Sequence, residues 1–321
     1  MAGISIIIPV KDGEATLERC LQSIRDQTIN DELEIIVLNS MSTDKSVAIA
    51  ERFNAKIIDI PNGTFDHGLT RNTGMQNASY GLIYLTVQDA WISKNDMLEK
   101  MSKHFDDAKI MAVSGHQAVP HEKDKNPFLW YKPYSPPQVT ERLVTNMEAF
   151  EKLSQNKQQS MVSWDNVVSM YRRSALIEQP FIKTEFTEDW VWSYQALLKG
   201  WKLLHDSSLI VYHYHHQSYS YTFNAVYTKN YHFYKFFRYL PSLPPLVMPM
   251  IRATWHLLRN KQLSFREKLY WIVHNSSATL AGYFSTSNFL FRLKIGGEKA
   301  IEKGYNIYCK VIPQGNQKNN I

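Results

Sequence analysis

The stretch from residue 4 to residue 60, ISIIIPVKDGEATLERCLQSIRDQTINDELEIIVLNSMSTDKSVAIAERFNAKIIDI, decides the fold. Its apolar runs at residues 4–10, 34–38 and 56–60 have the length of buried strands. Between them, residues 14–27 and 44–53 have helical spacing, and the first of these segments places Leu17, Cys20, Leu21 and Ile24 on one apolar stripe. Strands and helices in strict alternation predict a largely parallel sheet with helices on its faces.

The alternation continues beyond residue 60, with strands expected at residues 82–87 and 110–115 and helices at 70–78 and 95–105. Residues 116–160 are polar and contain five prolines, which favours a long excursion over one face of the sheet, the kind of loop that serves as a substrate lid. A second ordered stretch at residues 166–176 precedes a helix at 188–199, ended by Gly200, and a strand at 209–213. We therefore expect an open α/β domain in residues 1–216 and a helical region in residues 217–321.

The composition excludes several classes of protein. A chain of 321 residues with 44% hydrophobic residues can bury a full core, so it is not a peptide hormone, a linker or a disordered tail. Cys20 and Cys309 form at most one bridge, and no signal-like pattern precedes the first strand, so we expect a cytoplasmic protein. The longest apolar windows, residues 240–258 and 270–285, are interrupted by prolines or polar groups, and we expect no membrane-spanning helix.

The positive charge is concentrated in the C-terminal third. Residues 217–321 hold 14 Lys and Arg against 3 Asp and Glu, whereas the remainder holds 22 against 27. This distribution predicts a surface for an anionic partner. Aromatic residues alternate with the bases at Tyr219, Tyr221, Phe223, Tyr227, Tyr231, Phe233, Tyr234, Phe236, Phe237 and Tyr239. A helix of this kind either lies on an anionic membrane surface or packs on the protein or on a second copy, and both alternatives stay open. No nucleic-acid module is recognisable, so we expect no nucleic-acid partner.

Ligands of open α/β sheets bind beyond the carboxyl ends of the strands. Polar residues follow four of the expected strands, in the strings IIIPVKDGEATL (6–17), EIIVLNSMSTDKS (34–46), LTVQDAW (85–91) and LIVYHYHH (209–216). No glycine-rich phosphate loop follows the first strand, which argues against a dinucleotide fold and a P-loop.

These strings, together with FDHGLTRNTGMQNASYGLIYLTVQDAW (65–91), DNVVSMYRRS (165–174) and FTEDWVWSYQALLKGW (186–201), carry a resemblance. From about residue 3 to about residue 220 the chain resembles family 2 glycosyltransferases, which are inverting enzymes of the glycosyltransferase-A fold. Within that family it looks most like the bacterial rhamnosyltransferase-like members. The resemblance implies an open, mostly parallel sheet flanked by helices.

The resemblance also implies a nucleotide site. Pro9, Val10 and Glu14 would border the nucleotide, with Gln88 beside them. Asn39 stands where the family has an aspartate that accepts a hydrogen bond from the base, and an Asn carbonyl accepts without the help of charge. Arg71 matches the arginine that approaches the diphosphate or the base, a task that suits a planar guanidinium. Arg172 or Arg173 would assist it.

A metal site is implied at the end of the fourth strand. Asp89 lies in Gln-Asp-Ala, where the family has an Asp-x-Asp motif. A single carboxylate can hold Mg²⁺ or Mn²⁺ when nucleotide oxygens and water complete the octahedron, so we expect weak, donor-dependent binding. His213 matches a further ligand of the metal, and His215 and His216 are the alternatives.

Glu188 and Asp189 match the acidic pair of the family at a helix start, where the second acid is the catalytic base. An inverting transfer needs one carboxylate that takes the proton from the attacking hydroxyl. Thr187 followed by two acids is also a good helix N-terminus. Trp164, Asp165 and Asn166 fall in the segment that binds the acceptor in relatives.

The resemblance therefore implies transfer of a sugar, with rhamnose preferred, from a UDP- or dTDP-sugar to a growing glycan in bacterial surface polysaccharide synthesis. The acceptor would be an oligosaccharide or a lipid-linked glycan at the inner face of the cell membrane. The alternative is a non-catalytic nucleotide-sugar-binding protein, which Asn39, Met41 in place of a usual glycine and the incomplete metal motif favour. The intact Asp189 argues against that alternative.

Overall fold

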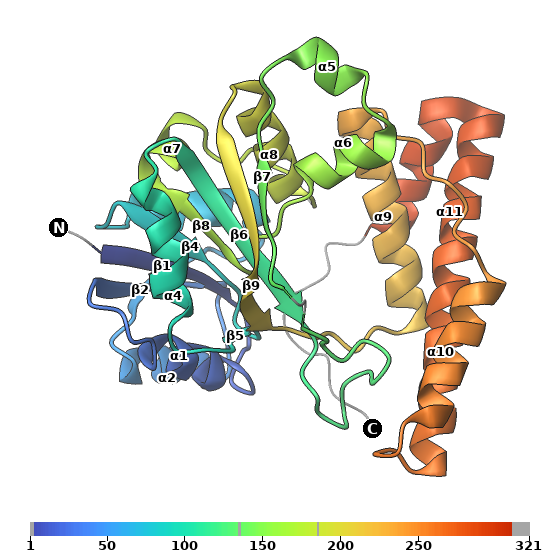
Figure 1. Ribbon diagram of the computed structural model, residues 1–321, viewed down its shortest axis with the longest axis horizontal. Coiled ribbons are helices and arrows are strands. Elements are labelled where there is room, and N and C mark those ends of the chain that lie inside the picture. The colour runs from blue at the N-terminus through green and yellow to red at the C-terminus, as the bar shows by residue number, and fades with distance from the viewer. Residues whose placement is uncertain (1–2, 134–135, 185, 310–321) are drawn as a thin grey trace. The chain divides into compact units, whose positions relative to one another are not determined.

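The computed structural model describes residues 3–133, 136–184 and 186–309. These residues form two compact units (Figure 1). The first contains residues 3–118 and 132–214, and the second contains residues 119–131 and 215–309. The division follows Tyr214, two residues before the predicted boundary, and Val119–Tyr131 belongs with the C-terminal helices.

The described strands of the first unit form one mixed, nine-stranded sheet in the order β3-β2-β1-β4-β8-β6-β9-β5, with β7 paired to β9. The strands are β1 (Gly3–Val10), β2 (Glu32–Asn39), β3 (Lys56–Asp59), β4 (Leu82–Leu85), β5 (Trp91–Ile92), β6 (Ile110–Ala118), β7 (Val139–Arg142), β8 (Ser169–Arg172) and β9 (Lys202–Tyr212). The first four strands pair in parallel, and β8 lies antiparallel between β4 and β6. The expected open α/β architecture is confirmed.

The central strand β1 explains why helices cover both faces of the sheet. Its residues point alternately to opposite faces, so Ile4, Ile6 and Ile8 join one apolar cluster and Ile7 joins the other. A strand that is apolar on both sides needs cover on both sides. The first cluster receives α1 (Leu17–Arg25), α2 (Ser46–Arg52) and α4 (Met97–Lys103), and the second receives α3 (His67–Gln76), α7 (Arg173–Glu178) and α8 (Glu188–Leu198).

The helices of the first unit are α1 (Leu17–Arg25), α2 (Ser46–Arg52), α3 (His67–Gln76), α4 (Met97–Lys103), the 3-10 turn η1 (His104–Asp106), α5 (Met147–Glu151), α6 (Gln155–Val162), α7 (Arg173–Glu178) and α8 (Glu188–Leu198). The predicted stripe of α1 is buried in full, and Gly200 follows α8 with a φ of 73°. A positive φ suits glycine, and this explains why the helix ends there.

Two sequence predictions about the middle of the chain are wrong. Residues 116–160 contain β7, α5 and α6 in addition to loops. β9 begins at Lys202 and not at residue 209, because the polar run from His205 to Ser208 hides the first half of the strand from an apolar pattern. The structure tolerates that run because Asp206 bonds to His104 and to Ser208, and because the register with β6 shifts beside it.

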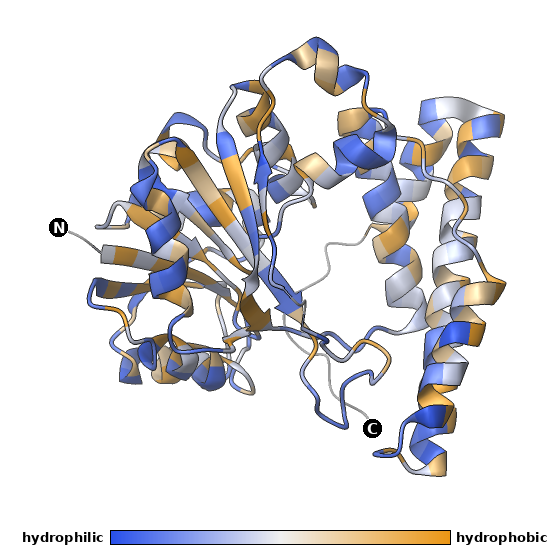
Figure 2. Cartoon of the chain, viewed as in Figure 1, coloured by the Kyte–Doolittle hydropathy of each residue, from blue (hydrophilic) through white to orange (hydrophobic). Residues whose placement is uncertain are grey.

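The second unit contains α9 (Tyr219–Phe237), α10 (Val247–Arg259) and α11 (Phe265–Tyr308), which has non-helical backbone at Gly297. Tyr227 and Tyr231 of α9 are buried against Phe289, Ile301 and Tyr305 of α11. The described part of this unit has no helix that is both long and apolar enough to cross a bilayer. Figure 2 shows hydrophobic and hydrophilic residues interleaved along its helices.

Candidate active site

Helix α3 carries Arg71, the first charged group of the site, and the start of this helix is fixed by a cap. Asp66 caps this helix, because its carboxylate accepts from the backbone N–H groups of Gly68 and Leu69 at 3.0 and 2.9 Å. The helix therefore begins at His67, three residues before the predicted start. A Cβ on Gly68 would lie 2.8 Å from the carbonyl oxygen of Ile182, so glycine lets the helix approach that loop closely.

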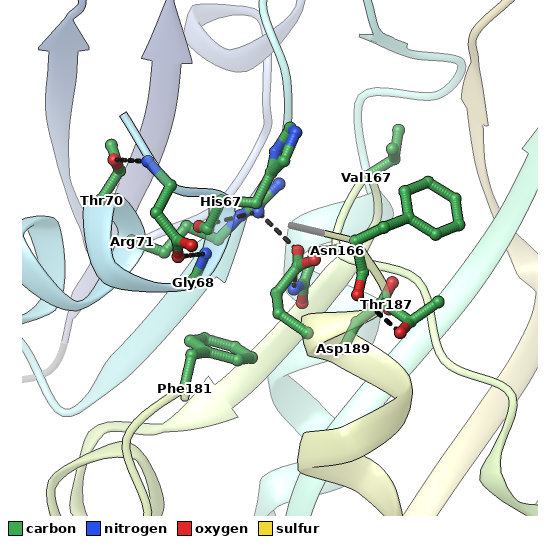
Figure 3. Close-up of polar contacts among 12 residues, drawn as sticks. His67, Gly68, Thr70, Arg71, Asn166, Val167, Phe181, Thr187 and Asp189 are labelled. Carbon is green, nitrogen blue, oxygen red and sulfur yellow. Dashed lines mark hydrogen bonds and ion pairs between the residues drawn. The ribbon is translucent and has the colours of Figure 1, made fainter. Parts of the chain in front are cut away.

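Arg71, one turn into α3, forms a buried ion pair with Glu188 at the start of α8. The distance from Arg71 Nη1 to Glu188 Oε1 is 2.7 Å, and both side chains are almost fully buried. Arg71 also donates to the carbonyl oxygen of His67 at 3.1 Å. Figure 3 shows Arg71 on α3 with Asn166 and Asp189 across from it. The resemblance assigns the Arg71 guanidinium to the nucleotide. In the structure it is paired with Glu188, one of the two predicted catalytic acids.

A buried chain of hydrogen bonds supports Glu188 from the other side. Asn166 donates to Glu188 Oε1 at 3.2 Å and accepts from the hydroxyl of Tyr171 at 2.6 Å. The indole of Trp164 donates in turn to the Tyr171 hydroxyl at 2.7 Å. The resemblance places Trp164 and Asn166 on the acceptor side. In the structure both belong to the hydrogen-bond chain that ends at the Glu188 carboxylate. Tyr171 was missed because a tyrosine inside a strand gives no signal of its own.

Asp189 lies beside this ion pair with different electrostatics. Burial raises the pKa of its carboxyl well above the usual range, and the charges of Glu188 and Asp165 add to that effect. Burial would also raise the pKa of Glu188, but Arg71, His67 and Asn166 outweigh it and lower that pKa. The residue Asp189 as a whole is only half-buried. The pair therefore consists of one carboxylate held ionised and one carboxyl that binds a proton unusually well, as a general base does.

A second cluster contains the predicted metal ligands. His213 Nε2 lies 3.4 Å from Asp89 Oδ1, and the ligand atoms of Asp89, His213 and His215 all lie within 4.8 Å of one another. Gln117, which the sequence analysis missed, lies 2.7 Å from His213 Nδ1 through its Oε1, and its amide nitrogen donates to Asp165. Gln117 is the penultimate residue of β6, in the run SGHQA, so the strand-end rule applied to the sixth strand would have found it.

The Gln117 contacts determine which histidine nitrogen carries the hydrogen. A carboxylate only accepts, so the amide nitrogen faces Asp165 and the amide oxygen faces His213. His213 Nδ1 must then donate to that oxygen. In the neutral imidazole this leaves Nε2, which lies 3.4 Å from Asp89 Oδ1, as a ligand atom, so Nε2 and the carboxylate can bind the same cation. The oxygen and imidazole ligands fit Mg²⁺ or Mn²⁺.

The turn after β1 rests on Gln88. The amide of Gln88 accepts from the backbone N–H of Lys11 at 2.8 Å and donates to the Lys11 carbonyl at 3.1 Å. Pro9 and Val10 are buried at the end of β1, directly before this turn. Gln88 therefore holds the edge of the sheet where the sequence predicts the nucleotide.

The ends of β2 and β3 lie side by side, because the register pairs Asn39 with Asp59. Asn39 donates to Asp59 Oδ1 at 2.7 Å and accepts from the backbone N–H of Ser42 at 3.0 Å. A carboxylate thus reaches this edge from β3, and the sequence analysis overlooked it although it directly ends an apolar run. Glu14 Oε2 accepts from the Lys45 backbone N–H at 3.2 Å, which ties the two loops together.

Arg172 has a structural task. Its guanidinium donates to the carbonyl oxygens of Phe105 and Ile110 at 2.6 and 2.8 Å. These contacts join β8 to η1 and to the first residue of β6.

Comparison with known proteins agrees with this geometry. Residues 5–178, more than half of the chain, match the family model described as glycosyl transferase family 2. The chain belongs to glycosyl transferase family 2. The match covers β1 through α7 and ends before α8, so the roles of Glu188 and Asp189 in this family 2 chain rest on the residues themselves.

Two curated relatives are O-antigen chain rhamnosyltransferases. RfbN of Salmonella typhimurium is 29% identical over 219 residues, which is 66% of either chain. WbaN of Salmonella anatum is 33% identical over 130 residues, or 40% of either chain. The matched stretches span less than two thirds of the length of each relative.

Solved structures share the fold of this family 2 chain. Staphylococcus aureus TarS 1-349 superposes with a TM-score of 0.56 at 15% identity and covers 97% of this chain and 81% of its own. The mannosyltransferase PcManGT from Pyrobaculum calidifontis, solved with GDP-Man and Mn²⁺, gives 0.53 at 14% identity and covers 96% and 84%. The glycosyltransferase-A type of fold is thereby established.

Proposed function

We propose that this family 2 chain transfers a sugar from a nucleoside-diphosphate sugar to a glycan acceptor with inversion at the anomeric carbon. The observation that carries the proposal is the asymmetric acidic pair. The pKa of Asp189 is raised, and it lies beside a Glu188 that Arg71 keeps ionised. A half-buried carboxyl of raised basicity beside an ionised partner favours a catalytic role over nucleotide-sugar binding alone.

In this mechanism Asp189 takes the proton of the acceptor hydroxyl. The oxygen then forms a bond to the anomeric carbon from the face opposite the leaving group, and the bond between that carbon and the diphosphate oxygen breaks. The nucleoside diphosphate leaves with the electron pair. Glu188 does not exchange protons at neutral pH, because Arg71 and Asn166 stabilise its charge. Its task is to hold the start of α8 and to increase the basicity of Asp189.

Asp89 and His213, with His215, would hold Mg²⁺ or Mn²⁺ against the donor diphosphate. The orientation of His213 by Gln117 supports this assignment. When bound, the cation supplies charge that stabilises the departing diphosphate. Pro9, Val10, Glu14, Asn39, Arg71 and Gln88 remain the proposed surroundings of the nucleotide, and Trp164, Asp165 and Asn166 those of the acceptor.

The two rhamnosyltransferase relatives support a deoxyhexose donor, with dTDP or UDP as its nucleotide. TarS has been solved with UDP-GlcNAc, so a hexose or N-acetylhexosamine is the competing donor class. A surface glycan, carried on a lipid, is the acceptor that the O-antigen relatives favour.

The test measures release of nucleoside diphosphate from UDP-, dTDP- and GDP-sugars, with and without Mg²⁺ or Mn²⁺ and with crude lipid-linked glycan. One donor should turn over, and Asp189→Asn should lower its rate by about 10²- to 10⁴-fold. Asp26→Asn, which changes an exposed carboxylate at the end of α1 that accepts a hydrogen bond from Gln22, is the matched control. If a donor binds but the wild type releases no more diphosphate than a protein-free control in the presence of acceptor, the chain is a binding protein. If the wild type and Asp189→Asn release it equally fast above that control, Asp189 is not the catalytic base.

A further inference from the structure

Helix α10 carries an apolar stripe on its surface. Met248, Ile251, Trp255 and Leu258 are 68, 56, 58 and 52% exposed. Their spacing of three, four and three residues places all of them on one face of the helix. The structure thus exposes four large apolar side chains, one of them a tryptophan, along a single line.

The opposite face of α10 accounts for its packing within the second unit. Ala253 and Leu257 are buried, and Leu257 joins a cluster with Leu263 and Trp271. The helix is therefore held by one face, and within the described residues the stripe is not needed for that packing. An exposed apolar stripe on a helix that is already packed indicates a binding surface.

Cations border the stripe. Arg252, Arg259 and Lys261 are exposed, and the Arg259 guanidinium lies 4.0 Å over the Trp255 ring. Residues 240–270 contain five Lys and Arg but one acid, Glu267. Three further exposed apolar residues, Phe265, Leu269 and Val273, follow on the first turns of α11. The apolar surface and the positive charge thus occur in the same segment.

We propose that the α10 stripe, defined as Met248, Ile251, Trp255 and Leu258, docks on an anionic lipid bilayer with the helix parallel to the membrane plane. Apolar side chains below and cations at the edge are what an interfacial helix presents to headgroups of negative charge. A helix of 13 residues is too short to cross the bilayer, so it lies in the interface.

A second copy of the chain fits this face less well. Two copies that met through α10 would bring two sets of the same cations together, and like charges oppose such a contact. A bilayer with anionic headgroups complements the same charge.

This assignment moves the membrane surface away from α9. The sequence left open whether the aromatic residues of residues 219–239 contact a membrane or pack on the protein. Tyr227, Tyr231 and Phe233 are buried in the second unit and are not available to lipid. The proposal does not depend on the transferase activity.

The test is co-sedimentation of the full chain with vesicles of phosphatidylcholine, alone or with about one third phosphatidylglycerol. Binding should require the anionic lipid and should weaken when salt rises from about 0.1 to about 0.5 M. The double variant Ile251→Ser/Trp255→Ser should lower the partition coefficient at least about tenfold, because two apolar anchors are lost. Arg252→Gln and Arg259→Gln should each lower it about fivefold.

The matched control is Leu129→Ser/Ile177→Ser, which removes two apolar side chains of similar exposure outside the stripe. It should bind vesicles as the wild type does, and all variants should keep the circular dichroism spectrum of the wild type. Equal binding to neutral and anionic vesicles, or equal loss in the stripe and control variants, would overturn the proposal. Self-association without vesicles that the stripe variant abolishes would identify a second copy as the occupant and would also overturn it.

Discussion

The buried Arg71–Glu188 pair allows a quantitative prediction. The two side chains are 4% and 9% exposed and 2.7 Å apart. Replacing Glu188 by Gln leaves the guanidinium buried without a counter-charge, and the Arg71 Nε has no other partner among the described residues. Removal of one member of a buried ion pair destabilises a protein by about 3 to 5 kcal/mol. For a unit of this size the melting temperature should fall by about 10 °C.

The assay is thermal and urea unfolding of the wild type, Glu188→Gln, Arg71→Met and the double variant. The double variant should recover about 2 kcal/mol relative to the sum of the single changes, because it leaves no unpaired charge behind. Glu99→Gln provides the control, since Glu99 pairs with Lys103 on the exposed face of α4 and should change stability by less than about 1 kcal/mol.

The effect should depend on pH in a defined direction. The pKa of Glu188 is lowered in the folded protein, so its stabilising contribution is present above the ordinary value of 4.5 and is lost as pH falls through the lower folded value. The penalty of Glu188→Gln should therefore shrink in acid. A Glu188→Gln variant as stable as Glu99→Gln at neutral pH would refute the reasoning.

Three further predictions concern the catalytic unit. The raised pKa of Asp189 should place the acid limb of the rate–pH profile above the ordinary aspartate value of 3.8. Asp165→Asn should move that limb to lower pH, because the Asp165 charge helps to raise the Asp189 pKa. An unmoved limb would exclude Asp189 as the titrating base. Gln117→Leu should weaken Mn²⁺ binding by about 10- to 100-fold in an electron paramagnetic resonance titration, and unchanged affinity would mean that this residue does not orient the ligand. Gly115→Ala would bring a Cβ against the carbonyl oxygen of Leu209 in β9 and should cost about 1 to 3 kcal/mol in urea unfolding. Gly81→Ala, with open space around it, should be neutral, and equal effects would contradict the steric argument.

The spacing of apolar residues correctly predicted those helices and strands whose buried side can be read from the local sequence alone. The stripe of α1 and the apolar runs of β1 and β2 are examples, because periodicity alone decides which side of a helix or strand is buried. The polar strand β9 and the inserted strand β8 show the limit. Their pairing is decided by partners far along the chain, and a polar run such as residues 205–208 can be a strand once those partners satisfy it.

The sequence by itself determined the α/β class, the strand ends that supply polar residues and the asymmetry of charge, because these depend on residue type and local pattern. The acidic pair was singled out by the resemblance to the family. Only the tertiary structure decided which polar side chains form hydrogen bonds with one another. Arg71 lies 117 residues from Glu188, and Gln117 lies 96 residues from His213, yet both pairs are in hydrogen-bond contact. Likewise, only packing decides that α9 buries its aromatic residues while α10 exposes its apolar stripe, because burial depends on which neighbour covers a face and not on the composition of that face.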